Sequence, residues 1–133
     1  MNRTIVHFEI PANDPVKLAD FYRALFGWKI EKAEGQTDYW LVETAPQGQG
    51  VNGGLMLRQS PDQVVTNYVQ VESVESYCRH IEELGGRILI PRQEVPGMGC
   101  FAICQDLEGN GFGIWEGTIR EEVREPDLEV TPY

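Results

Sequence analysis

Residues 7 to 28 read HFEIPANDPVKLADFYRALFGW, and this stretch decides the fold. Its first residues alternate in character, as they do along a β-strand whose two faces meet different surroundings. By that alternation His7 and Glu9 share one face of the strand, while Phe8 and Ile10 share the other. An ionisable pair is therefore expected on one side of the predicted sheet.

A helix follows this strand directly. Asp14 is a typical capping residue, and Pro15 suits the first helical position, where its missing N–H costs nothing. Apolar side chains then recur at three- and four-residue spacing from Leu18 to Phe26, which places them on one helix face. Gly27 is expected to end the helix.

The same order of elements recurs about 60 residues later. After a predicted strand at 67–71, Ser73 is placed to cap a second amphipathic helix, which Gly85 and Gly86 stop. Three further strands are expected after each helix, at 28–32, 39–43 and 55–57 and then at 87–90, 100–104 and 112–116. Pro91 is expected to end the strand at 87–90. The sequence thus predicts an α+β fold of two βαβββ modules.

The composition limits the class of function. The chain has 133 residues and a formal net charge of −10, from 21 acidic and 11 basic residues. That length fits one globular domain, and the charge disfavours binding to nucleic acid or to an anionic membrane surface. No apolar run approaches the roughly 20 residues of a membrane span. Three cysteines do not make a disulfide framework, so we expect a cytoplasmic protein.

Five stretches resemble the vicinal oxygen chelate superfamily, which includes glyoxalase I, extradiol dioxygenases and bleomycin-resistance proteins. They are Phe8–Pro11, Phe21–Trp28, Asn52–Leu55, Pro96–Gly99 and Asp106–Gly113. Together they look most like a lactoylglutathione-lyase-related subgroup. The resemblance implies a cupped, partly open eight-stranded mixed sheet with the helices on the outside, completed in a homodimer.

The resemblance also implies domain boundaries. It covers residues 4–116, so we expect one glyoxalase-like domain at 1–116, with modules at about 4–60 and 65–116. Residues 117–133 are acidic and contain little apolar sequence, which predicts a solvated tail or an arm over a neighbouring subunit.

Metal-using members of the superfamily place one ligand on each of four strands, and those positions can be transferred to this sequence. The first falls on His7, and the others fall on Gly54, Thr66 and Gly113. A hydroxyl is a poor ligand beside imidazole and carboxylate, and glycine supplies no ligand at all. We therefore expect no family-type metal site, no cofactor and no standard glyoxalase reaction. A weakly held divalent ion on His7 and Glu9, completed by water, is the alternative.

Glu9 and His7 are the candidate catalytic residues, as an acid–base pair. An unpaired carboxylate on an inward strand position is costly to bury, so Glu9 predicts a wet cavity, a raised pKa or a cationic partner. The structural alternative for Glu9 is a salt bridge with Arg58, and that for His7 is a buried imidazole with satisfied hydrogen bonds.

Aromatic and polar residues expected on the inner face form the candidate ligand-binding set. Their apolar, flat walls suit a planar or hydrophobic small molecule, unless the same side chains fill the cup and leave no pocket. The predicted set is Trp40, Met56, Arg58, Thr66, Tyr68, Gln70 and Trp115.

Two functions of different classes follow from these residues. One is a glyoxalase-like enzyme, a lyase or isomerase that uses Glu9 and His7 as its acid–base pair. The other is a protein that binds and sequesters a small aromatic molecule without catalysis. They differ in whether Glu9 and His7 reach one guest in the same cavity.

Overall fold

The computed structural model describes residues 3–35, 38–46 and 48–118. The elements follow the predicted order, strand, helix and three strands, twice over. The first module holds β1 (Ile5–Ala12), α1 (Pro15–Phe26), β2 (Lys29–Lys32), β3 (Tyr39–Glu43) and β4 (Gly53–Leu57). The second holds β5 (Thr66–Gln70), α2 (Val74–Glu83), β6 (Arg87–Val95), β7 (Gly99–Gln105) and β8 (Gly111–Gly117).

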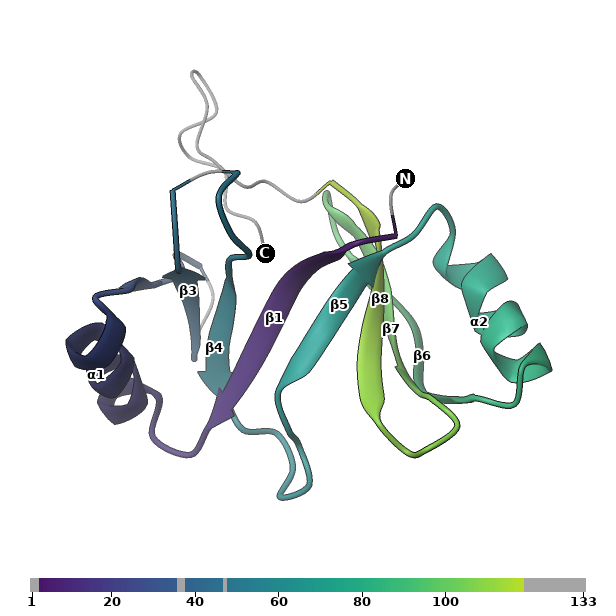
Figure 1. Ribbon diagram of the computed structural model, residues 1–133, viewed down its shortest axis with the longest axis horizontal. Coiled ribbons are helices and arrows are strands. Elements are labelled where there is room, and N and C mark those ends of the chain that lie inside the picture. Colours follow the sequence, from purple (N-terminus) through teal and green to yellow (C-terminus); the bar gives the residue numbers. More distant parts are fainter. Residues whose placement is uncertain (1–2, 36–37, 47, 119–133) are drawn as a thin grey trace.

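The strands form one open, mixed sheet of eight strands in the order β2-β3-β4-β1-β5-β8-β7-β6. Within each module the first strand runs parallel to the last, β1 beside β4 and β5 beside β8. The two modules join through the antiparallel pair β1 and β5 at the centre of the sheet. Figure 1 shows this pair between the two helices, which lie at opposite ends of the molecule. The predicted fold class and internal repeat are confirmed.

Each helix packs on one face of its own four strands. Ala19 of α1 packs with Trp40 and Leu55, and Val74 of α2 packs with Ala102 and Ile114, in two separate apolar cores. Because side chains alternate along a strand, the neighbours of these core residues point to the opposite face. That opposite face is inward and carries the candidate site.

The local signals of the first helix act as predicted. Asp14 Oδ1 accepts a hydrogen bond from the backbone N–H of Lys17 at 3.1 Å, and Pro15 opens the helix. Gly27 ends it in the left-handed conformation, with φ of 73°. No helix within the described residues is long and apolar enough to cross a membrane. The predicted tail at 117–133 lies outside the described residues beyond residue 118.

Several strands are longer than predicted, and β6 and β4 show why. β6 continues through Pro91 to Val95, because it is the edge strand of the sheet and Pro91 there has no ladder hydrogen bond to lose. The register against β7 shifts on both sides of Ile90, which accommodates the proline. β4 begins at Gly53, two residues before its predicted start at residue 55, because glycine is the residue that fits so close to Phe8.

A second close approach lies in β8, at Gly113. A Cβ atom on Gly113 would overlap the ring of Tyr68 on the adjacent strand β5. Gly111, on the same strand and at the same alternation, has no atom nearer than 3.9 Å to such a Cβ. The Tyr68 ring can therefore take its position only because residue 113 is a glycine, which has no side chain.

We expect Gly113→Ala to destabilise the protein by about 1–3 kcal/mol, the usual cost of overpacking. The matched variant Gly111→Ala should be neutral or slightly stabilising, because the added methyl makes only an ordinary van der Waals contact, with the Cys104 carbonyl oxygen at 3.9 Å. Urea unfolding of both variants measures the difference. Equal stabilities for the two variants would contradict this account of the Tyr68 packing.

Candidate functional site

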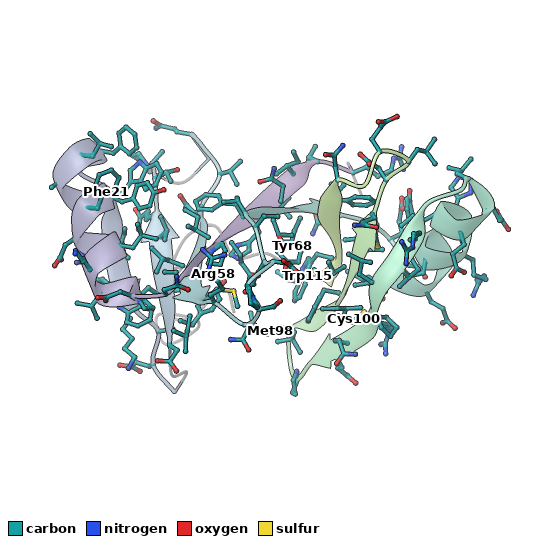
Figure 2. The ribbon with its side chains drawn as sticks, turned by 90° about the horizontal axis from the view of Figure 1, so that it is seen from below. Phe21, Arg58, Tyr68, Met98, Cys100 and Trp115 are labelled. Atoms are coloured by element: carbon teal, nitrogen blue, oxygen red, sulfur yellow. The ribbon has the colours of Figure 1, made fainter. Side chains whose placement is uncertain are left out.

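A cavity of about 580 Å³ opens on the inward face of the sheet, and both modules line it. Figure 2 places two of its residues, Tyr68 and Trp115, in the middle of the molecule, well away from Phe21 on α1. The volume is within the range of small-molecule sites. The lining residues among those described are Glu9, Tyr39, Met56, Gln59, Ser60, Gln63, Thr66, Tyr68, Ile90, Glu94, Val95, Pro96, Phe101, Ile103 and Trp115.

Glu9 forms the polar centre of this cavity. Its Oε1 accepts a hydrogen bond from the Tyr68 hydroxyl at 2.7 Å, and its Oε2 accepts one from the Tyr39 hydroxyl at 3.0 Å. The side chain is 16% exposed, and that exposed part faces the cavity. Two tyrosines from two different strands thus fix one carboxylate and leave part of it accessible.

His7 lies behind Tyr39 and does not line the cavity. Its side chain is 3% exposed, and its Nε2 is 3.0 Å from the Tyr39 hydroxyl and 4.0 Å from Glu9 Oε2. Burial lowers the pKa of His7 to about 3, so the imidazole is neutral at neutral pH. Because Tyr39 donates its only proton to Glu9, His7 Nε2–H must donate to the Tyr39 oxygen.

The protonation of Glu9 is coupled to this arrangement. Burial raises the pKa of the Glu9 carboxyl, and the hydrogen bonds from Tyr68 and Tyr39 oppose that rise. When Glu9 takes up a proton, the chain can reverse: Glu9 donates to Tyr39, and Tyr39 donates to His7 Nε2 in its other tautomer. The site therefore offers two hydrogen-bonding patterns, which differ by one proton on Glu9 and by the tautomer of His7.

The residues at the family's ligand positions do not fit a four-ligand metal site. Gly54 and Gly113 leave space, and tyrosine fills it: a Cβ at Gly54 would overlap the Tyr39 hydroxyl, as one at Gly113 would overlap Tyr68. The Thr66 hydroxyl donates to the backbone carbonyl of Val64 at 3.3 Å. Within the part of the chain that the structure describes, no three His, Cys, Asp or Glu side chains gather to hold a metal ion.

Four of the predicted ligand-binding residues line the cavity, and three lie elsewhere. Met56, Thr66, Tyr68 and Trp115 line it. The other three, Trp40, Arg58 and Gln70, do not line it.

These three residues make other contacts and do not line this cavity. Trp40 belongs to the core under α1, because its neighbour Tyr39 takes the inward face of β3. Arg58 Nε donates to Asn13 Oδ1 at 3.0 Å, and the guanidinium also reaches backbone carbonyls, so the alternative salt bridge to Glu9 is not formed. Gln70 Nε2 donates to the carbonyl of Gly117 at 2.8 Å, which ties β5 to the end of β8.

Sequence reasoning missed three residues that matter at the site. Tyr39 and Phe101 line the cavity from β3 and β7, and Glu94 reaches it from β6. The signal for Tyr39 was present, since adjacent aromatic residues at 39 and 40 must face opposite sides of a strand. Glu94 gave no such signal, because its strand was expected to end before it.

The lowered pKa of His7 predicts how the stability of the protein depends on pH. Its folded-state pKa of about 3 lies below the ordinary 6.5, so the folded state resists protonation and loses stability as pH falls through this window. For one such group the loss from about pH 7 to about pH 5 is about 2 kcal/mol. Glu9 changes stability in the opposite direction, because its pKa is raised.

His7→Gln should therefore lose about 2 kcal/mol less stability than the unaltered protein over that pH change. Urea unfolding at both pH values measures the loss of stability in each protein. Both proteins contain Glu9, so its opposite contribution is present in both measurements. An identical loss in the two proteins would show that His7 does not resist protonation.

Two curated relatives are similar to this chain. The anthracycline biosynthesis protein DnrV of Streptomyces peucetius is 23% identical over 134 residues, which cover 86% of this chain and 47% of the relative. The anthracycline biosynthesis protein DauV of Streptomyces sp. (strain C5) matches with the same identity and coverage. The chain thus spans about half the length of the curated relatives it matches.

Solved structures share the fold. The hypothetical protein BH1468 of Bacillus halodurans has a TM-score of 0.66 and 14% identity, over 92% of this chain and 99% of that one. A variant of Streptomyces coelicolor methylmalonyl-CoA epimerase, in complex with 2-nitronate-propionyl-CoA, has a TM-score of 0.61 and 18% identity, over 90% and 97% of the two chains. A family model also matches residues 4–114. On that match, and with the duplicated fold it implies, the chain belongs to the glyoxalase/bleomycin resistance protein/dioxygenase superfamily.

Proposed function

We propose that this protein binds a small aromatic or hydrophobic molecule in the cavity of the inward face, with Glu9 as the polar anchor. The observation that carries this proposal is the partly accessible Glu9 carboxylate, which two tyrosine hydroxyls hold at the centre of the cavity. A carboxylate kept in such a place stays costly unless a guest or water solvates it. A guest with a hydrogen-bond donor can solvate the carboxylate, and its flat apolar body can lie against the rest of the cavity.

The walls of the cavity support an apolar guest. Trp115, Phe101 and Tyr68 line it, and the rings of Tyr68 and Phe101 meet edge to face at 6.3 Å between centroids. Aromatic walls of this kind favour flat ligands, because ring stacking adds to the burial of apolar area. The names of the curated relatives refer to anthracycline biosynthesis, and anthracyclines are fused-ring aromatic compounds, which further supports an aromatic guest.

Filling the cavity should weaken binding. Ile103→Trp adds volume inside the cavity, whereas the control Leu107→Trp adds the same side chain at a position that is 73% exposed. Titration with the neutral fluorescent dye Nile red should give saturable binding to the unaltered protein and to Leu107→Trp, with at least about a tenfold loss in Ile103→Trp. Undiminished binding to a folded Ile103→Trp would place the dye outside this cavity and refute the proposal.

A second candidate is an acid–base lyase or isomerase, and the chain from Glu9 through Tyr39 to His7 favours it. In this scheme a Glu9 carboxylate oxygen takes a proton from carbon next to a carbonyl, and the electron pair moves to the carbonyl oxygen. The abstracted proton stays on Glu9 until it returns to carbon, and the Tyr68 hydroxyl keeps its hydrogen bond to the other carboxyl oxygen meanwhile. A neutral His7, with its lowered pKa, leaves the change of charge in this step on Glu9 alone.

Glu9→Gln separates the two candidates. An acid–base enzyme should exchange the carbon-bound proton of a suitable substrate with deuterium oxide, and Glu9→Gln should slow that exchange by about 100-fold or more while the protein stays folded. Proton NMR with methylmalonyl-CoA, the compound named by a structural neighbour, and with the glutathione–methylglyoxal hemithioacetal measures it. Exchange that is absent, or equally fast in Glu9→Gln, would dismiss the acid–base candidate.

The homodimer and the lack of a family-type metal site belong to the same proposal. The edge strand β6 leaves Leu89 and Ile90 about half exposed, which supports pairing with a second copy at that end of the sheet. The Tyr39 hydroxyl occupies the space that a side chain at Gly54 would need, and the Tyr68 ring occupies the space that a side chain at Gly113 would need. We therefore propose a site that acts through Glu9 and its tyrosines and not through a tightly chelated ion.

A further inference from the structure

The charge of the cavity lining is one-sided. Among the described lining residues, the carboxylates are Glu9 at the centre and Glu94, an exposed residue of β6, and no lysine, arginine or histidine stands beside them. When both carboxylates are ionised, the lining is negative without a compensating cation. This asymmetry bears on which guest the cavity accepts.

The nearby basic side chains do not supply that cation. Arg58 borders an adjacent hollow, and its guanidinium donates to Asn13 Oδ1 and to two backbone carbonyls. His7 is neutral, because burial lowers its pKa to about 3. The charge of Glu9 is therefore moderated by tyrosine hydroxyls, which are neutral donors.

Glu9 still has capacity to accept hydrogen bonds. A carboxylate offers about four acceptor positions, and the two tyrosines occupy one on each oxygen. The remaining positions belong to a side chain that is 16% exposed and borders the cavity. A guest N–H can reach them without displacing either tyrosine.

The aromatic walls add a second attraction for positive charge. The rings of Tyr68, Phe101 and Trp115 border the same space as Glu9. The face of an aromatic ring attracts a cation electrostatically, and this attraction grows where water is excluded. A delocalised cation on a flat ring system would stack on these walls and donate to Glu9 at the same time.

We propose that the ligand of this cavity is a cationic aromatic molecule, a flat ring system bearing a protonated amine or amidine-type nitrogen that hydrogen-bonds to Glu9. This inference rests on the proposed function, since it concerns the same cavity and names the charge of its guest. A neutral guest would leave the carboxylate without a counter-charge, and an anionic guest would add repulsion from Glu9 and Glu94.

Three flat, fluorescent three-ring probes of different charge test the inference: cationic proflavine, neutral acridone and anionic anthracene-2-carboxylate. Fluorescence titrations of the unaltered protein at neutral pH and at high salt, which screens attraction to the acidic surface, give the ranking. Proflavine should bind at one site about tenfold or more tightly than either of the other probes.

Charge-neutral variants then locate the effect. Glu9→Gln should weaken proflavine binding by about 10- to 100-fold and change acridone binding little. Glu108→Gln, in the exposed turn before β8, removes the same charge and should leave proflavine binding unchanged. Near-UV circular dichroism checks the fold of each variant, and the ranking in the unaltered protein decides even if Glu9→Gln fails to fold.

The outcomes separate the inference from the proposed function. Acridone or anthracene-2-carboxylate binding as tightly as proflavine, with competition by Nile red, would overturn the cationic preference and leave an aromatic-binding cavity. Proflavine binding that Glu9→Gln and Glu108→Gln weaken equally would also overturn it, because the attraction would then be general surface charge. If no probe and no Nile red bound, the proposed function itself would fail.

Discussion

The site depends on one carboxylate held by two tyrosine hydroxyls. Glu9 accepts from Tyr68 at 2.7 Å and from Tyr39 at 3.0 Å, and these donors come from strands on either side of β1. Charge on Glu9 would otherwise be costly on the inward face of the sheet. Because the hydrogen bonds favour the ionised form while burial favours the protonated one, Glu9 is placed to respond to a proton or to a cationic guest.

Two glycines make that arrangement possible. Gly54 and Gly113 leave the space into which Tyr39 and Tyr68 extend, and a side chain at either position would overlap a tyrosine. The family's metal ligands would project from these same positions. A chelated ion and the tyrosine-held carboxylate thus compete for one space in the cup, and this sequence provides for the carboxylate. In the proposed function the scaffold is kept, whereas the chemistry of its centre differs, because function depends on a site and not on a fold.

Most of the fold was predictable from local signals that repeat. The Asp14–Pro15 start, the Gly27 stop and the second copy of the pattern from residue 67 onward predicted both modules. The continuation of β6 past Pro91 was not predictable, since it depends on the strand being an edge. At the site, alternation along β1 predicted that Glu9 faces inward. Alternation along β3 could not decide whether Tyr39 or Trp40 faces inward, because both side chains are large and partly apolar. Nor could it predict the partners of Arg58, which are largely backbone carbonyls.

The most direct measurement is a crystal structure of the protein grown with nickel chloride, with anomalous diffraction data at the nickel edge. We expect both tyrosine hydroxyls on the Glu9 carboxylate and no nickel peak beside it, because the ligand positions at Gly54 and Gly113 are empty of donors and their space is filled. A nickel ion coordinated by His7 and Glu9, with the Tyr39 and Tyr68 hydroxyls turned away, would contradict the central claim.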